Sequence, residues 1–444
     1  MSGKKSTKSK ISRRKFIGTT GCAAIGSTAF LSSFTSLGMM NSLTATSQPD
    51  DYRALVCILL AGGNDAYNMV VPTSSEPYNV YAASRSNLAL PYGDLIQLNY
   101  ADPDGIHYGL HPAMPEVANL FNSGKAAVIS NVGTLVEPVT KTQILAGTAR
   151  LPLGLKSHSD QSRHWQTSVP QSRMANGWGG KIAEILATGN TNQDLSMNLS
   201  PGGTNFWQAG NKIDEFTLSN QHDVFTAAID NLTPLTTEFA DTDISNQMKR
   251  VAQSIAVSGN LGMERQTYYV KLSGFDTHEE LLNNHNNLLS LLSGAIGSFY
   301  EAMDELGTSE KVTTFTISDF ARTITSNGSG TDHAWGGHSL VFGGAVNGSQ
   351  IYGKVPSLDL QGDRVVEKNI VIPEISTDSY FAELAMWMGV PSSSLADIFP
   401  NLENFYTTGT ENPIGFMNMT SQDLTTQYNT LDLTSLSKLS EDRQ

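Results

Sequence analysis

The sequence has very little cysteine, with residues only at Cys22 and Cys57. Removal of an N-terminal segment from 1 to 45 would leave Cys57 alone, inside an apolar run. A disulfide within the remaining chain is therefore excluded, even in an oxidising compartment. The stability of the chain must come from a hydrophobic core.

Basic residues are also few, with 28 lysine and arginine residues against 42 aspartate and glutamate residues. Residues 1–45 hold seven of the 28 basic residues and no acidic one, which leaves 21 against 42 and a formal charge of about −21. So acidic a chain repels nucleic acid and anionic membrane surfaces. The acidic surplus suits the binding of divalent cations, or serves only as a solubilising surface.

The basic residues at the N-terminus form part of a targeting pattern. A lysine-rich stretch leads to Ser-Arg-Arg-Lys-Phe-Ile at 12–17, and a mildly apolar run follows from 18 to about 40. Paired arginines, a phenylalanine and a core rich in Gly, Ala and Thr resemble a twin-arginine signal peptide. We expect residues 1–45 to be this signal, with the twin-arginine translocase as the partner during export. The mature protein is then periplasmic or otherwise exported.

Two other interpretations of this segment stay open. The apolar run is close to the roughly 20 residues that cross a bilayer, so it would also suit an uncleaved anchor. Its many Gly, Ser and Thr residues favour the signal instead, and small residues at 43–47 offer a cleavage site. Cys22 raises a lipoprotein alternative, although it lies close to the arginine pair. We expect no stable membrane span in the mature form.

Four apolar runs predict strands buried on both faces, at 53–60, 126–133, 267–272 and 311–317. Segments at 112–123 and 279–306 have the apolar spacing of helices. Strand and helix alternation predicts an α/β fold: a doubly wound, mostly parallel sheet with helices on both faces. Aspartates follow three of the strands, at Asp65, Asp276 and Asp319. Ligands bind at the carboxyl ends of such strands, so we expect these carboxylates at a shared site.

The domain organisation is predicted from changes in composition. One α/β domain is expected from 51 to 410. Within it, the segment from about 186 to 260 is richer in Asn, Thr, Ser and Gly, and we interpret it as an insertion or cap. The tail at 411–444 is polar and is expected to be peripheral.

Histidine and carboxylate residues occur together in three short groups, around His158, at 276–278 and at 331–338. Imidazole and carboxylate ligands suit zinc, manganese, calcium or magnesium, according to the mix. In the alternative, the aspartates cap helices and the histidines bond the backbone. We predict that some of these residues share one divalent metal ion; the candidate ligands are Asp65, Asp276, His278, Asp319, His333 and His338.

Several ordered motifs carry a family resemblance that spans about 53 to 400. They are Leu-Ala-Gly-Gly-Asn-Asp-Ala-Tyr-Asn-Met-Val-Val-Pro at 60–72, His-Pro-Ala-Met at 111–114, Gly-Phe-Asp-Thr-His at 274–278, Ile-Ser-Asp-Phe-Ala-Arg at 317–322, Gly-Thr-Asp-His-Ala-Trp-Gly-Gly-His at 330–338, Phe-Gly-Gly at 342–344 and Tyr-Gly at 352–353. The chain resembles the exported bacterial family called domain of unknown function 1501. That family is similar to the alkaline phosphatase and sulfatase superfamily, which cleaves phosphate or sulfate esters at a metal site.

The resemblance assigns metal roles to the same acidic residues. Asp65 corresponds to the first-strand aspartate, Asp276 with His278 to the later ligand pair, and Asp319 to the aspartate after the next strand. The last histidine ligand corresponds to His338 or, in the alternative, to His333. The chain departs from the superfamily in having Phe320 directly after Asp319, where a histidine is usual, and in the short spacing of 276 and 278. One metal is therefore expected.

The resemblance also implies a nucleophile at a helix N-terminus, where backbone N–H groups favour an anionic substrate. Ser157 is the candidate nucleophile and the adjacent His158 is a further catalytic candidate; the alternative role of Ser157 is an N-cap. Arg322 is predicted to hold the anionic oxygens of the substrate, or else to form a surface ion pair. A sulfatase-like stretch from Ser168 to Arg173 places its arginine one residue too far along.

The predicted function is thus an exported metal-dependent hydrolase of phosphate or sulfate esters. Its expected substrate is an anionic small molecule or a carbohydrate ester. Two alternatives from other classes remain: a catalytically degenerate relative that binds a polyanion, carbohydrate or partner protein, and a structural protein of the cell surface. Phe320 at the position of a metal histidine favours the first of these.

Overall fold

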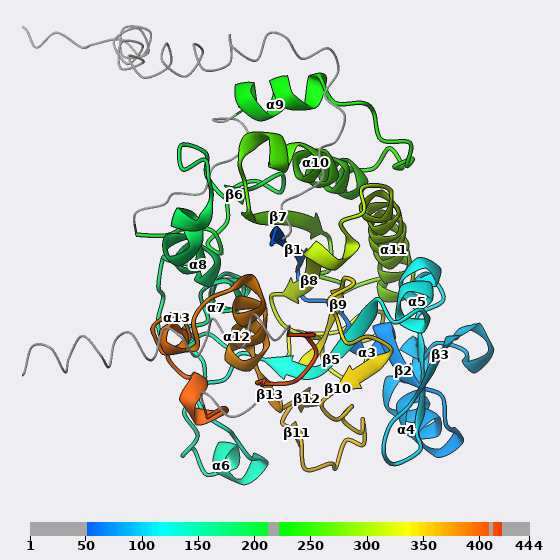
Figure 1. Cartoon of the computed structure of the whole chain (residues 1–444). Coiled ribbons are helices and arrows are strands. Elements are labelled where there is room, and N and C mark those ends of the chain that lie inside the picture. Colours follow the sequence, from blue (N-terminus) through cyan, green and yellow to red (C-terminus); the bar gives the residue numbers. More distant parts are fainter. Residues whose placement is uncertain (1–50, 212–221, 408–411, 420–444) are drawn as a thin grey trace, which may run out of the picture.

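The structure is a computed structural model that describes residues 51–211, 222–407 and 412–419. The predicted signal peptide and most of the predicted tail lie outside the described residues. A mostly parallel central sheet forms the middle layer of the molecule (Figure 1). Its strands, in spatial order, are β10 (Gln350–Tyr352), β5 (Ala126–Gly133), β9 (Gly337–Phe342), β8 (Val312–Ser318), β1 (Arg53–Ala61), β7 (Arg265–Ser273) and β6 (Asn198–Leu199), and β13 (Ile375–Ser376) pairs with β5.

The direction of the strands confirms the predicted α/β class. Strand β1 runs parallel to both of its neighbours, β7 and β8, and β6 and β10 also pair in parallel. Among the described strands of the central sheet, only β9 runs antiparallel to the strands beside it, β5 and β8. The four strands that were predicted from apolar runs are β1, β5, β7 and β8. Their side chains are almost all buried because the sheet is covered on both faces.

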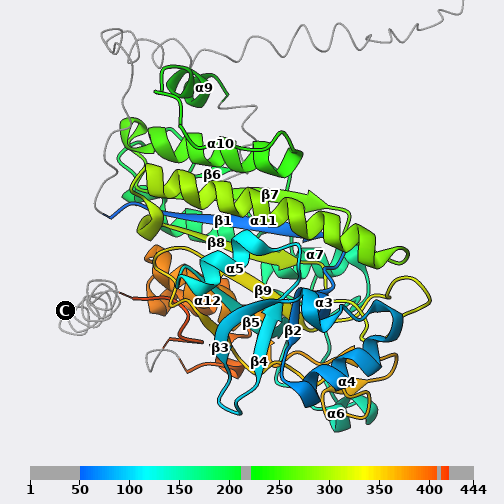
Figure 2. The same ribbon diagram turned by 90° about the vertical axis from the view of Figure 1, so that its right-hand side faces the viewer.

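Helices cover both faces of the sheet (Figures 1 and 2). One face is covered by α5 (Pro115–Asn122), α10 (Asp243–Ser258) and α11 (Leu281–Glu305), which pack against one another and against β5 and β7. The other carries α7 (His158–Thr167), α8 (Trp178–Leu186) and α12 (Thr377–Met388). Helix α7 contacts β8, α12 contacts β1 and β5, and α8 packs against α7. Helices α5 and α11 lie in the segments predicted to be helical. No described helix is long and apolar enough to cross a bilayer.

Smaller elements surround this core. The chain from β1 to β5 forms an antiparallel sheet of β2 (Val70–Pro72), β4 (His107–Leu110) and β3 (Ile96–Ala101), and a two-stranded sheet joins β11 (Val365–Val366) to β12 (Ile370–Val371). The remaining helices are α3 (Ala66–Met69), α4 (Ser75–Arg85), α6 (Lys141–Leu145), α9 (His222–Asp230) and α13 (Leu395–Ile398).

The segment expected to be an insertion or cap, about 186–260, supplies the edge strand β6 and the helix α10. Since β6 pairs with β7 and α10 packs against α11, its described parts continue the sheet and one helical layer. The boundaries of an insertion stay a prediction.

The tail was predicted to be peripheral from residue 411, and this is wrong for 412–419. Phe416 and Met417 are buried in the main core, and the carboxylate of Glu383 accepts hydrogen bonds from the backbone N–H groups of Ile414, Gly415 and Met417. The two apolar side chains and the buried carboxylate hold this part of the chain against α12.

A buried carboxyl in α12 predicts a pH effect on stability. Burial raises the pKa of Asp378 to about 7, although Ser168 and the backbone of Asn401 donate hydrogen bonds to it. Between pH about 4 and about 7 the folded protein therefore holds a proton that the unfolded chain has lost, so rising pH lowers the free energy of unfolding. Asp378→Asn imitates the protonated acid and should remove this loss, which is at most about 4 kcal/mol.

The measurement is chemical denaturation of both proteins at several pH values across this window. The advantage of Asp378→Asn over the wild type should grow as the pH rises. A difference that stays constant with pH would contradict a raised pKa for this carboxyl.

Candidate metal centre

Three neighbouring parallel strands, β8, β1 and β7, end at the same edge of the sheet, as predicted. The turn after β1 bonds to the turns after the other two. The N–H of Gly62 donates to Asp319 Oδ2 at 3.1 Å, and the N–H of Phe275 donates to Ala61 O at 3.1 Å. Gly62 has a φ of +119°, and a Cβ at this position would lie 2.3 Å from the backbone N of Asp276. Only glycine permits this close approach of the turns.

The chain after β8 folds back on itself and brings two motifs together. Arg322 and His333 form an antiparallel bridge, and Thr323 N donates to Asp332 O at 2.9 Å. The loop between them packs on the turn after β7, where a Cβ on Gly330 would lie 2.2 Å from the backbone of His278. His333 is thereby placed beside His278, from which it is separated by 55 positions.

The third histidine, His158, is the first residue of helix α7. Ser157 is its N-cap and accepts a hydrogen bond from the N–H of Asp160, so the helix begins at His158. The imidazole of His158 packs against Phe320, with 4.8 Å between ring centroids, and Phe320 in turn packs against His333 at 4.5 Å. The phenyl ring thus sets the positions of both imidazoles.

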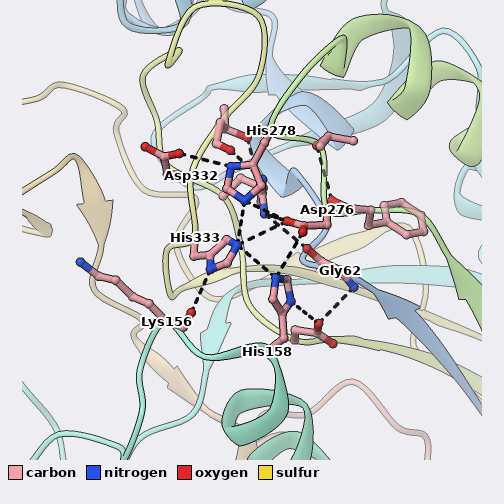
Figure 3. Close-up of polar contacts among 12 residues, drawn as sticks. Gly62, Lys156, His158, Asp276, His278, Asp332 and His333 are labelled. Carbon is pink, nitrogen blue, oxygen red and sulfur yellow. Dashed lines mark hydrogen bonds and ion pairs between the residues drawn. The ribbon is translucent and has the colours of Figure 1, made fainter.

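His158, Asp276, His278 and His333 form a group that we call the histidine cluster (Figure 3). His333 Nε2 lies 3.0 Å from His158 Nε2 and 2.9 Å from His278 Nε2. Oxygens of Asp276 lie 3.5, 3.1 and 3.3 Å from the Nε2 atoms of His158, His278 and His333. Tetrahedral ligands of zinc, at about 2.1 Å from the ion, are separated by about 3.4 Å. The ligand atoms of His158, Asp276 and His333 all lie within 4.8 Å of one another, so these three residues fit a single cation, and His278 lies beside them.

In each imidazole of the cluster, Nδ1 lies close to an oxygen atom. The acceptors are Asp319 Oδ2 for His158 at 2.8 Å, Asp332 Oδ1 for His278 at 3.3 Å and the carbonyl of Lys156 for His333 at 2.8 Å. In the tautomer with the proton on Nδ1, Nδ1–H donates a hydrogen bond to each of these oxygens, and the Nε2 lone pairs are directed at one another. Such lone pairs repel unless a proton or a cation lies between them. Oriented imidazoles of this kind are typical of metal ligands in proteins.

A buried arginine fixes the carboxylate of the cluster. Arg322 has no exposed side-chain surface and donates from Nη1 to Asp276 Oδ1 at 2.8 Å. Its other donors reach the carbonyls of Gly62 and Thr331 and the hydroxyl of Thr331. Partial burial alone would raise the pKa of Asp276, but the hydrogen bond and charge of Arg322 outweigh it and lower the pKa below its ordinary value. Asp276 is thus held as an anion.

The pKa values of His158 and His333, the two most buried imidazoles of the cluster, are shifted in opposite directions. The hydrogen bond with Asp319 raises the pKa of His158, while burial lowers the pKa of His333. His333 is therefore the more readily available as a neutral ligand. The side chains of Asp276 and His278 remain 47% and 42% exposed, so the cluster is open to solvent.

Two of the predicted ligands lie away from the cluster. Asp65 is fully buried and forms an ion pair with Arg85. His338 is in strand β9, where burial lowers its pKa to about 4 and its Nδ1 accepts a hydrogen bond from the N–H of Asn131 at 3.2 Å. Asp319 is near the cluster but its carboxylate faces His158 Nδ1 and the N–H of Gly62. The structure therefore brings together Asp276, His278 and His333, with Asp319 behind them.

The catalytic predictions are placed differently as well. His158, predicted to act beside the nucleophile, is one of the convergent imidazoles. Arg322 directs its donors to protein acceptors, so it orients Asp276 and is not free to hold a substrate anion. In the sulfatase-like stretch, Ser168 donates to the buried Asp378 and Arg173 pairs with Asp160.

Other residues of the site were not predicted. Asp332 and the carbonyl of Lys156 orient imidazoles, and Gly62 contributes both its N–H and its carbonyl. Asp332 lies next to His333 and could have been found from that adjacency. Nothing in the local sequence indicates the contact of Lys156.

The comparison with protein families supports part of the resemblance. Residues 236–382 match the family described as "Protein of unknown function (DUF1501)". The match includes Asp276, His278, Arg322 and His333. It begins after His158, which therefore lies outside it. It confirms over these residues the resemblance inferred from the motifs. No curated protein matches the chain.

The chain is also similar to solved structures. One is a protein in the alkaline phosphatase superfamily from Vibrio parahaemolyticus, at 11% identity, with 78% of this chain and 69% of that chain covered and a TM-score of 0.35. Another is a 2-O GAG sulfatase, at 8% identity, 81% and 76% coverage and a TM-score of 0.37. A third is the C-terminal periplasmic domain of EcEptC from Escherichia coli in complex with Zn, at 11% identity, 79% and 83% coverage and a TM-score of 0.34.

Proposed function

We propose that the histidine cluster holds one divalent metal ion and that the chain is a metal-dependent hydrolase of phosphate or sulfate esters. The proposal is carried by the proximity of the Nε2 atoms of His158 and His333 to each other and to the carboxylate of Asp276, with His278 beside His333. The ester class comes from the family resemblance of the motifs. The substrate would be an anionic small molecule or a carbohydrate ester.

The donor set narrows the choice of metal. Imidazole nitrogens with one carboxylate suit zinc better than manganese, calcium or magnesium, which prefer oxygen ligands. When bound, such an ion withdraws charge from an ester oxygen and lowers the pKa of the attacking group. Arg322 keeps Asp276 ionised and in position, and Asp319 keeps the Nε2 of His158 directed toward the ligand site.

The role of Ser157 as the nucleophile stays a prediction, and its contacts are those of a helix cap. Ser157→Ala should lower the free energy of unfolding by about 1 kcal/mol, because the first turn of α7 loses its acceptor. Ser157→Asn restores an acceptor and should recover most of that stability. Thermal unfolding of the two variants measures the effect. Loss of ester hydrolysis in both variants, with stability retained in Ser157→Asn, would assign Ser157 as the nucleophile.

Export is part of the proposal. The twin-arginine pattern at 12–17 supports passage through the twin-arginine translocase and a periplasmic or otherwise exported location. That route suits a protein that folds around its metal before translocation. The acidic charge of the mature chain supports the absence of nucleic acid among its ligands.

A catalytically degenerate binding protein is the second candidate function. Phe320 favours it, since its ring packs against His158 and His333 at the position where the resemblance expects a metal histidine. A metal-replete protein that binds polyanions or carbohydrates but hydrolyses none of a broad ester panel would support this candidate.

The experiment that tests the proposal is elemental analysis of the mature protein purified from periplasm, beside two variants. His158→Ala with His333→Ala removes two convergent imidazoles, and His107→Ala removes an exposed histidine outside the cluster. Near-stoichiometric metal in the wild type and in His107→Ala, with loss in the double variant, is the expected result. Phosphate and sulfate esters are then screened with the metal found. Metal-free wild type that gains none on incubation with zinc or manganese contradicts the proposal.

A further inference from the structure

Arg85, the last residue of α4, is buried and is not part of any motif in the sequence. Its side chain has no exposed surface. Its Nη1 donates to the carbonyls of Thr323 at 3.1 Å and Ile324 at 2.9 Å, and its Nη2 forms the ion pair with Asp65. One guanidinium thus joins the turn after β1 to the loop after β8.

Both of these segments act directly on the cluster. The turn after β1 carries Gly62, which donates to Asp319 and accepts from Arg322. The loop after β8 carries Asp319, which orients His158, and Arg322, which orients Asp276. The carbonyl bound at Thr323 belongs to the residue that follows Arg322. A shift of either segment would therefore move an imidazole or the carboxylate of the cluster.

The contacts of Arg85 require the shape of a guanidinium. Its Nε donates to Asn68 Oδ1 at 3.1 Å, while Asn68 also accepts from Tyr81 and donates to the carbonyl of Leu88. The acceptors lie along separate edges of one planar group. A lysine ammonium is a compact charge on a flexible stem, so it can pair with Asp65 but cannot reach all of these acceptors.

We propose that Arg85 is a positioning residue of the metal centre: through its bonds to Asp65, Thr323 and Ile324 it holds the two segments that orient His158 and Asp276. This inference rests on the proposed function, because metal binding is one of its readouts. The hydrogen bonds and the ion pair of Arg85 are made with residues outside the cluster.

The test compares Arg85→Lys with two matched controls in the mature protein. Arg364→Lys changes a surface arginine that pairs with Glu374, and Val257→Ala lowers stability in the core of α10 without touching either segment. Zinc affinity is measured by chelator competition, and the visible spectrum of the cobalt form reports the ligand geometry. Arg85→Lys should bind zinc about 10- to 100-fold more weakly, as expected for residues that orient ligands, and should shift the cobalt spectrum. Both controls should retain the wild-type values.

A second readout does not require metal. Nitrogen-15 NMR of the metal-free protein, labelled at histidine, reports the tautomer and hydrogen bonding of each imidazole. Arg85→Lys should shift the ring signals of His158 and His333 and leave that of the exposed His107 unchanged. If Arg85→Lys does not fold, Asn68→Ala replaces it, since it removes one acceptor of the same guanidinium, and the same shifts are expected at smaller size.

The two readouts separate the possible failures. Wild-type protein without metal affinity refutes the proposed function, and the NMR comparison still decides the role of Arg85. Folded Arg85→Lys with unchanged histidine signals and, where the wild type binds zinc, unchanged zinc affinity overturns the inference. A loss of affinity in Val257→Ala equal to that in Arg85→Lys also overturns it, since general loss of stability would then account for the effect.

Discussion

Asp276→Asn is expected to weaken the binding of zinc by at least about 100-fold, because Asp276 is the only carboxylate that contacts all three imidazoles of the cluster among the described residues. Loss of a residue that merely orients a ligand already lowers metal affinity about 10- to 100-fold, and loss of a ligand should exceed that range. The amide also removes the negative charge that balances Arg322 and the cation. Competition with a fluorescent chelator measures the change.

Asp332→Asn is the matched control for this prediction. Its carboxylate lies 3.3 Å from Nδ1 of His278 and does not face the centre of the cluster. Because an asparagine oxygen still accepts a hydrogen bond from Nδ1–H, a loss of about tenfold or less is expected. Equal losses in the two variants would mean that the cluster depends on overall negative charge, and wild-type affinity in Asp276→Asn would exclude this residue as a ligand.

Arg85→Met is expected to lower the free energy of unfolding by about 3–5 kcal/mol, since removal of one partner leaves the other charge of a buried ion pair uncompensated. Asp65 is fully buried, and one of its oxygens already has no hydrogen-bond partner among the described residues. The carbonyls of Thr323 and Ile324 lose their donor as well. Denaturant unfolding of the metal-free protein measures the loss without a contribution from bound metal.

A double variant tests whether the charge of Asp65 is the cause. Arg85→Met with Asp65→Leu removes both charges, and replacement of a buried ion pair by apolar residues is often nearly neutral. The double variant should therefore be more stable than Arg85→Met, with a coupling energy of about 2 kcal/mol or more. Additive losses would show that the two side chains act independently and that Asp65 is not held by Arg85.

The fold could be predicted because its signals are local. The runs that form β1, β5, β7 and β8 are apolar without alternation, which is typical of strands covered on both faces. Helix α11 was visible from its apolar spacing. The antiparallel β9, at 337–342, was not among the predicted strands. That error also misplaced His338, which the sheet buries against Asn131 and Tyr67.

The candidate ligands were predicted only in part. Asp276, His278 and His333 were chosen for their types and for following strands, and all three lie in the cluster. Asp65 satisfied the same criteria, yet it forms an ion pair with Arg85 of α4 and lies outside the candidate metal site. His158 was predicted to be a catalytic residue and not a ligand, and the N-terminus of α7 places its Nε2 beside that of His333. The type of a residue that follows a strand therefore identifies it as a candidate ligand, but does not show which side chain it pairs with.

The sequence by itself determined the α/β class, the edge of the sheet at which acidic residues gather and the histidines available there. These features could be predicted because hydrophobic periodicity and the ends of strands depend on short stretches of sequence. The tertiary structure alone decided which carboxylate pairs with an arginine and which one meets the imidazoles. Those choices depend on distances of a few ångströms between segments far apart in the chain, such as Asp65 with Arg85 and Asp276 with Arg322. Such distances depend on how the helices and turns pack on the sheet, so they cannot be predicted from local sequence.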